Sequence, residues 1–202
     1  MIAIVDYGVG NLRSVEKALQ QVGAQTVVTS DGQTILDAGG VVVPGVGAFR
    51  DGMAQLRRQG LDRVICMVAA QGKPLLGICL GMQLLFESSE EMGFCEGLAL
   101  LEGRVVRFPA TGLKIPQTGW NRLWFAQQHP LLGGLSDGCY VYFNHSYFCQ
   151  ATAQEVVLAH AEYGIRYPVA VGCERVFGVQ FHPEKSQEIG LRILRNFVEM
   201  AR

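Results

Sequence analysis

The sequence predicts a single α/β domain over residues 1–202: a mixed, mostly parallel sheet with helices on its faces and a small antiparallel extension. Three observations predict it. In the first half, short apolar runs alternate with segments of helical periodicity, as in a doubly wound sheet. Residues 98–148 are rich in aromatic side chains and interrupted by glycine and proline, which favours antiparallel strands with long loops. The last segment returns to one strand and one helix.

The individual elements follow from these patterns. Apolar runs predict strands at residues 2–5, 26–29, 41–43, 74–78 and 176–181. Pro44-Gly45 is expected to stop the third strand. Apolar residues at helical spacing predict helices at 12–22, 49–56, 61–70, 80–87 and around 193–198. Asn11 is expected to cap the first helix and Gly23 to end it.

The composition excludes several protein classes. Of the 202 residues, 49% are hydrophobic and 17% charged, which is too apolar for a disordered chain. Seventeen basic against eighteen acidic residues give none of the basic excess typical of nucleic-acid binders. The N-terminus does not resemble a signal peptide, and no apolar run is long enough to span a membrane. The six cysteines form no C-x-x-C pair and no zinc spacing, so we expect no metal, reduced thiols and a cytoplasmic protein.

The segment Gly77-Ile78-Cys79-Leu80-Gly81 carries the strongest chemical signal. An apolar strand runs into G-x-C-x-G and then a helix, as in a nucleophile elbow, where the nucleophile occupies a sharp strand-to-helix turn. A thiol at a helix N-terminus is also favoured as thiolate. Taken alone, the segment is equally compatible with a buried structural cysteine between two packing glycines.

A thiol nucleophile needs a base, and His182 is the candidate. It follows an apolar strand, at the end where parallel sheets place their sites. Pro183 biases His182 toward an extended backbone, in which Glu184 points to the same side and can orient its ring. The alternative is a polar turn after a strand. His129 is expected in a surface loop, and His160 after an apolar run without a functional role.

Acyl transfer also requires donors for an oxyanion. One candidate is the Leu80 N–H, next to Cys79. The other is the Val46 N–H, because Gly45 and Gly47 on either side would let that peptide rotate. An ordinary strand-ending loop remains the alternative for this segment.

These residues resemble the class I (triad) glutamine amidotransferases, and among them the glutaminase subunits of imidazole glycerol phosphate synthase. The resemblance spans nearly the whole chain. It is carried by residues 6–12 (DYGVGNL), 44–49 (PGVGAF), 77–85 (GICLGMQLL), 119–121 (GWN), 145–147 (HSY) and 178–186 (GVQFHPEKS). Residues 116–118 (PQT) and Asn144 depart from the usual pattern. They lie on the side expected to face a partner, so they leave the predicted triad unchanged.

The resemblance implies a flavodoxin-like fold and a role for each site residue. Cys79 attacks the side-chain amide of glutamine, His182 carries protons, and Glu184 orients the histidine. The γ-glutamyl thioester is then hydrolysed to glutamate, without a cofactor. The resemblance implies further oxyanion or substrate contacts from Gly45, Val46, Gly47, Leu80, Gln83, Ser146 and Tyr147.

The resemblance also implies a partner, a (β/α)8-barrel cyclase subunit that receives the ammonia and forms imidazole glycerol phosphate. The implied interface residues are Asn11, Trp120, Asn121, Tyr142, His145 and Lys185. The length agrees, because one domain of 202 residues can hold a glutamine site but has no spare segment to bind a phosphorylated nucleotide.

Other functions are compatible with parts of the sequence. The same glutaminase could supply ammonia to a synthase that amidinates surface-polysaccharide sugars. A silent binding subunit would not need an intact triad and Gln83. A stand-alone cysteine hydrolase would not need the PGVG and GWN segments. Gly8-Val9-Gly10 opens a helix as a dinucleotide fingerprint would, but the third glycine is absent, so we do not expect NAD binding.

Overall fold

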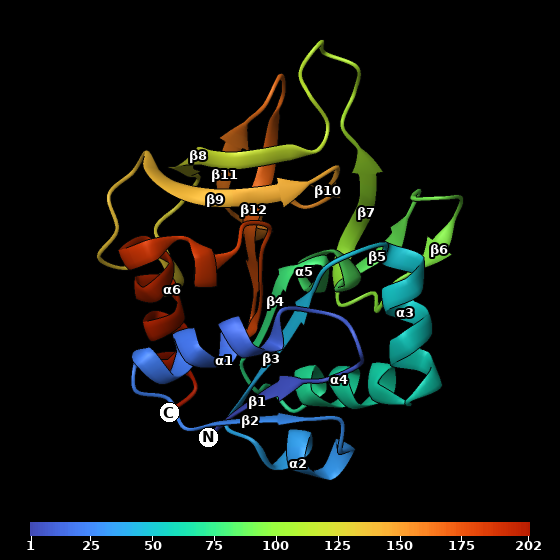
Figure 1. Ribbon diagram of the computed structural model, residues 1–202, viewed down its shortest axis with the longest axis vertical. Coiled ribbons are helices and arrows are strands. Elements are labelled where there is room, and N and C mark those ends of the chain that lie inside the picture. The colour runs from blue at the N-terminus through green and yellow to red at the C-terminus, as the bar shows by residue number, and fades with distance from the viewer.

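The computed structural model describes residues 1–202 and contains two sheets with flanking helices (Figure 1). The strands are β1 (Ile2–Val5), β2 (Thr26–Thr29), β3 (Gly40–Gly45), β4 (Leu75–Cys79), β5 (Phe86–Ser89), β6 (Cys95–Glu96), β7 (Leu101–Arg107), β8 (Gln117–Phe125), β9 (Cys139–His145), β10 (Tyr147–Ala151), β11 (Val157–Glu162), β12 (Arg166–Cys173) and β13 (Val176–Val179). The helices are α1 (Leu12–Gln21), α2 (Gly32–Asp37), α3 (Phe49–Arg58), α4 (Leu61–Ala70), α5 (Leu80–Leu84) and α6 (Gln187–Met200), with short 3₁₀ turns η1 (Pro130–Leu132), η2 (Gln154–Val156) and η3 (Pro183–Lys185).

The main sheet has nine strands in the order β2-β1-β3-β4-β13-β12-β11-β8-β9. The first five run parallel to one another, and the pairings from β13 through β12, β11 and β8 to β9 are antiparallel. The second sheet has the order β10-β7-β5-β6. The predicted fold class is therefore confirmed, with the antiparallel strands continuing the parallel ones at one edge.

Alternation along the parallel strands divides the core into two layers. Ile2 and Ile4 pack with α1 and α6, whereas Ala3 and Val5 pack with α2, α3 and α4 on the opposite face. Figure 1 shows α1 beside α6, and α3 and α4 on the other side of the strands. No helix combines the length and apolarity needed to cross a membrane.

Several predicted boundaries were wrong, and one of them is the end of the last strand, which stops at Val179 and not at residue 181. The third strand does not stop at Pro44, because β3 continues through Gly45. β1 pairs with β3 only as far as Val42, so at Pro44 a single strand, β4, flanks the chain, and such an edge-like position tolerates the missing N–H. The predicted helix 80–87 ends at Leu84, because Phe86 is buried and pairs with Leu101 in the second sheet. The pairing of Phe86 with Leu101 thus prevails over the helical spacing of residues 80–87.

Capping also differs from the prediction. The Asn11 side chain makes no capping hydrogen bond, because its backbone (φ −88°, ψ 63°) is not in the extended form typical of a side-chain cap. Helix α2 was not predicted. Its cap, Asp31, accepts a hydrogen bond from the Thr34 N–H at 2.8 Å, and this aspartate ahead of Ile35 and Leu36 was the available signal.

The turn from β4 into α5 has no intervening residue. Cys79 ends the strand with φ 55° and ψ −109°, a backbone conformation that residues other than glycine rarely adopt. The flanking glycines make this turn sterically feasible. A Cβ on Gly77 would lie 2.6 Å from the Gly81 backbone, and one on Gly81 would lie 1.8 Å from the Val43 carbonyl oxygen. The predicted elbow is confirmed.

The close approach at Gly81 predicts a large loss of stability for Gly81→Ala, of about 3 kcal/mol or more, because the clash is with backbone that cannot rotate away. Gly32→Ala is the matched control. Its Cβ would meet only the Cγ2 of Val64, at 3.0 Å, and the substitution favours helix α2. Urea unfolding of both variants measures the difference, and equal stability would contradict the packing described.

The backbone strain at Cys79 predicts that Cys79→Gly unfolds at higher denaturant than Cys79→Ala. Both variants lose the thiol, but only glycine adopts this φ without strain, and we expect a difference of about 1 kcal/mol. Urea unfolding of the two variants side by side is the measurement. If alanine proves as stable as glycine, the turn is not strained.

Candidate active site

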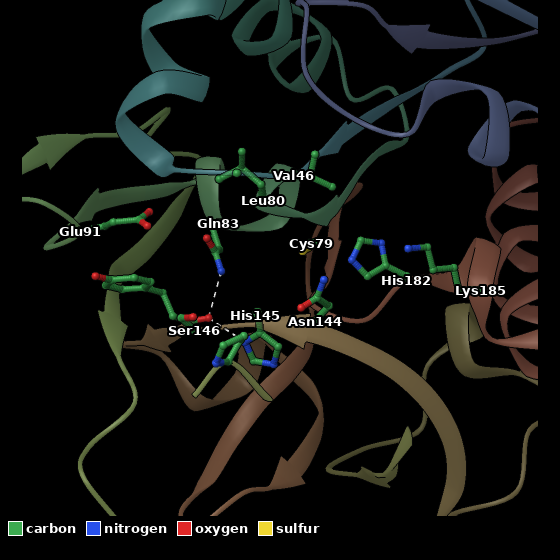
Figure 2. Close-up of a pocket in the computed structure, with 13 residues that line it drawn as sticks. Val46, Cys79, Leu80, Gln83, Glu91, Asn144, His145, Ser146, His182 and Lys185 are labelled. Carbon is green, nitrogen blue, oxygen red and sulfur yellow. Dashed lines mark hydrogen bonds between the residues drawn. The ribbon is translucent and has the colours of Figure 1, made fainter. Parts of the chain in front are cut away.

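The carboxyl ends of β3 and β4 open onto a cavity of about 240 Å³ (Figure 2). Most of the residues expected to bind glutamine line this cavity. The lining residues are Val46, Gly47, Cys79, Leu80, Gln83, Glu91, Pro116, Asn144, His145, Ser146, Tyr147, His182 and Lys185. The cavity therefore collects residues from the first, middle and last thirds of the chain.

The structure brings the three predicted catalytic residues together. The His182 Nδ1 lies 2.9 Å from the Glu184 Oε1, and both side chains are almost fully buried. Burial lowers the pKa of His182, but hydrogen bonds to Cys79 and to Glu184 outweigh it and raise this pKa to about 10. His182 is therefore an imidazolium at neutral pH and places a positive charge beside the Cys79 sulfur.

Strand β9 fixes the position of His182. The His182 N–H donates to the Tyr142 carbonyl at 2.9 Å. The Ser186 hydroxyl accepts from the Tyr142 N–H at 2.9 Å and donates to the His182 carbonyl at 2.6 Å. The backbone N–H and carbonyl of His182 are thus both linked to Tyr142 of β9, the carbonyl through the Ser186 hydroxyl.

The predicted oxyanion donors lie beside Cys79. Leu80 is the first residue of α5, so its N–H has no helical partner. The Val46 N–H forms no hydrogen bond within the protein, and its side chain is 44% exposed. Gly47 has φ 95°, and no atom stands within 4 Å of where its Cβ would be. Val46 and Gly47 thus form a loosely packed loop at the edge of the cavity.

Gly45 does not line the cavity, contrary to the expected contact with substrate. It is buried in β3, where a Cβ would lie 2.5 Å from the Tyr7 hydroxyl oxygen and 2.9 Å from the Leu80 Cβ. The Tyr7 hydroxyl donates to the Pro44 carbonyl at 2.7 Å, which anchors the strand immediately before the loop. The glycine is needed for this close packing.

Gln83, Ser146 and Tyr147 all line the cavity, as the resemblance implied. The Gln83 Nε2 donates to the Tyr147 carbonyl and to the Gln180 Oε1, each at 3.0 Å. The Tyr147 carbonyl also receives a hydrogen bond from the His145 Nδ1 at 2.8 Å, so both of its acceptor positions are filled.

Sequence reasoning missed two residues of the site. Glu91 lines the cavity, and its Oε2 accepts from the Phe49 N–H at 2.7 Å, at the start of helix α3. No local pattern marked it, because it stands in an irregular segment between β5 and β6. Gln180 is fully buried and contacts the Cys79 Sγ at 3.7 Å. The available signal was its place two residues before His182.

His145 is not an exposed interface residue in this structure, and that expectation is corrected. It is only 6% exposed, and its Nε2 lies 3.2 Å from the Tyr167 hydroxyl, which donates to the Gln117 Oε1 at 2.5 Å. Burial lowers the pKa of His145 to about 4, so it is neutral at pH 7. Strand β9 alternates its side chains, and position 145 points into the core with Phe143.

The other expected interface residues lie at or near the surface. Asn11, Trp120 and Lys185 are exposed, whereas Tyr142 and Asn121 are half-buried. The Lys185 Nζ lies 5.6 Å from the Tyr142 ring, and that ring packs edge-on against Trp120 at 6.1 Å. The three form a continuous surface that runs from the cavity along β8 and β9.

The remaining histidines lie away from the cavity. His129 lies in the loop before η1, as expected, but its side chain is half-buried, because its Nδ1 accepts from the Leu131 N–H at 3.1 Å and its ring packs on Phe177. Burial lowers the pKa of His129. His160 lies within β11 and not at a strand end.

Comparison with curated proteins identifies close relatives. The chain is 52% identical to the imidazole glycerol phosphate synthase subunit HisH of Methanosarcina mazei, with 98% of each chain covered. It is 51% identical to HisH of Geobacillus thermodenitrificans, covering 98% of this chain and 95% of the relative. HisH of Geobacillus kaustophilus is 52% identical, with coverages of 100% and 97%.

Solved structures share the fold at lower identity. One is a glutamine amidotransferase with a TM-score of 0.77 and 22% identity, covering 100% of this chain and 99% of that one. Another is PurLQS from Thermotoga maritima, with a TM-score of 0.73 and 20% identity, covering 99% and 96%. The family model "Glutamine amidotransferase class-I" matches residues 3–201. The chain therefore belongs to the class I glutamine amidotransferase family.

Proposed function

We propose that this chain is the glutaminase subunit of an imidazole glycerol phosphate synthase, which hydrolyses glutamine and supplies the ammonia for histidine biosynthesis. The observation that carries the chemistry is the geometry of Cys79, His182 and Glu184. A thiol on a strained elbow faces an imidazole that a buried carboxylate orients, at one cavity. About 50% identity to curated HisH subunits along the whole chain supports the pathway.

The chemistry follows from the charge state of the pair. The Cys79 thiolate attacks the side-chain amide carbon of glutamine, and the oxyanion that forms receives hydrogen bonds from the Leu80 and Val46 N–H groups. His182 gives its proton to the leaving nitrogen, so that ammonia departs and a thioester remains. His182, now neutral, takes a proton from water as the water attacks the thioester. Glutamate is released, and the thiolate and imidazolium are restored.

Polar groups at the far end of the cavity suit the amino-acid end of glutamine. We assign the α-ammonium to the Glu91 carboxylate and the Gln83 Oε1, since both can accept hydrogen bonds and both line the cavity. Backbone groups of Gly47, Ser146 and Tyr147 complete the site. The side-chain amide then points toward Cys79.

The ammonia acceptor lies on a second chain, the cyclase subunit HisF, a (β/α)8 barrel. We place the contact on the Trp120, Tyr142 and Lys185 surface, with Asn11 and Asn121 nearby. Tyr142 joins this surface to His182 through the main chain. We propose that binding the cyclase and its ligand turns the Val46 N–H inward. The identity to HisH favours this acceptor over a sugar-amidinating synthase, and six unpaired cysteines support a cytoplasmic setting.

Cys79→Ala tests the division of labour. In the assembled synthase it should abolish glutamine-dependent product formation, because no thioester can form. Synthesis from added ammonium salt should stay near the wild-type rate, because the acceptor site lies on the other chain. Both rates are measured spectrophotometrically. Loss of both activities would refute the separation, and retained glutamine hydrolysis would refute Cys79 as the nucleophile.

Glu91→Gln tests the placement of glutamine. Removing the negative charge should raise KM for glutamine about tenfold or more, the equivalent of one charge-assisted hydrogen bond, while kcat changes little. Glu90→Gln is the matched control, because Glu90 pairs with Arg104 on the surface outside the cavity. Steady-state kinetics of the assembled enzyme give both constants. A fall confined to kcat would place Glu91 elsewhere in the mechanism.

A further inference from the structure

Gln180 contacts both the nucleophile and a side chain that lines the substrate cavity. It follows β13 and is fully buried. Its Nε2 donates to the Cys79 Sγ at 3.7 Å, and its Oε1 accepts from the Gln83 Nε2 at 3.0 Å. The Gln180 amide thus contacts residues of the site through both its nitrogen and its oxygen.

The hydrogen bonds fix the orientation of both amides. The Gln83 Nε2 has two protons, and it directs one to the Tyr147 carbonyl and the other to the Gln180 Oε1. If the Gln83 amide were reversed, its oxygen would face two acceptor oxygens. The Gln83 Oε1 is therefore left free as an acceptor, and Figure 2 shows the amide nitrogen of Gln83 turned along its dashed bond. With its oxygen fixed on Gln83, Gln180 must present its N–H to the sulfur.

We propose that Gln180 is a catalytic residue with two tasks: its amide N–H stabilises the thiolate of Cys79, and its amide oxygen holds Gln83 with the acceptor toward the substrate. This rests on the proposed function, since it assumes Cys79 as nucleophile. The donor is neutral and buried, so its hydrogen bond to a charged sulfur is little weakened by water.

The other ionisable groups around the sulfur act differently. His182 is the positive group, and Lys185 lies farther along the same cavity. Tyr7 lies in the loop after β1, and Cys149 lies in β10. Burial raises the pKa of both side chains, the charge of Cys79 raises them further, and both therefore stay neutral. Among these neighbours, Gln180 offers the thiolate a donor whose charge does not change with pH.

The test compares two substitutions by alkylation of Cys79. Gln180→Met removes the donor, keeps a similar volume and adds no charge. Gln180→Glu keeps an oxygen that accepts from Gln83, and it lacks a donor only at pH values where the buried carboxyl is ionised. The free chain is treated with iodoacetamide between pH 5 and pH 10, and modification of the Cys79 peptide is followed by mass spectrometry. Cys173 is exposed and serves as an internal reference in every sample.

We expect Cys79 alkylation at neutral pH to slow roughly tenfold in Gln180→Met, as for loss of one hydrogen bond to a charged group, and its pH profile to shift upward. Gln180→Glu should slow it most at the alkaline end of the range, where the buried carboxyl ionises and the carboxylate repels the thiolate. In the assembled synthase, Gln180→Glu should lower kcat with KM for glutamine nearly unchanged, whereas Gln180→Met should also raise KM. Thermal melting identifies which variants are folded.

A wild-type alkylation profile in folded Gln180→Met would overturn the donor role, even if Gln180→Glu reacts slowly. Unchanged KM in Gln180→Met would overturn the second task. Should Gln180→Met not fold, a wild-type profile in folded Gln180→Leu, which also lacks a donor at every pH, would likewise overturn the donor role. These outcomes are separate from failure of the proposed function, which would show itself as glutamine hydrolysis by Cys79→Ala.

Discussion

A buried ion pair, the imidazolium of His182 against the carboxylate of Glu184, is the interaction on which the site depends. The Glu184 Oε2 has no hydrogen-bond partner, so this carboxylate is compensated chiefly through Oε1 and the histidine. Removing the charge of His182 would leave a buried, uncompensated anion. The same imidazolium lies beside the Cys79 sulfur. The positive charge next to the proposed nucleophile and the stability of this region therefore rest on the same contact.

Hydrogen bonds extend this arrangement toward the surface where we place the partner. The main chain of Tyr142 is bonded to His182 and Ser186, and its ring touches Trp120 and Lys185 at the surface. On the other side of the cavity, the Tyr147 carbonyl joins Gln83 to His145. Strand β9 thus contacts both the exposed surface and His182, and β10 contacts Gln83 at the cavity. Movement of either strand would alter the site without any change in the triad residues.

Much of the fold and the core of the site follow from local signals. Helical spacing located α4 at both ends, and G-x-C-x-G located the elbow, because a turn this tight leaves room only for glycine on each side. The signals failed where distant contacts decide. Phe86 joins a strand because Leu101 lies beside it, and His145 is buried because Phe108 and Tyr167 pack on its ring. Glu91 reaches the cavity because its carboxylate binds the start of α3. None of these partners is near in sequence.

The left-handed backbone at Cys79 also bears on how such a sequence evolves. The position favours a residue without a side chain, so the fold by itself selects against the cysteine. A mutation to glycine at this position would carry no cost in folding. Backbone strain and the proposed chemistry of the thiol thus act on position 79 in opposite directions: the turn favours glycine, and only the reaction favours cysteine.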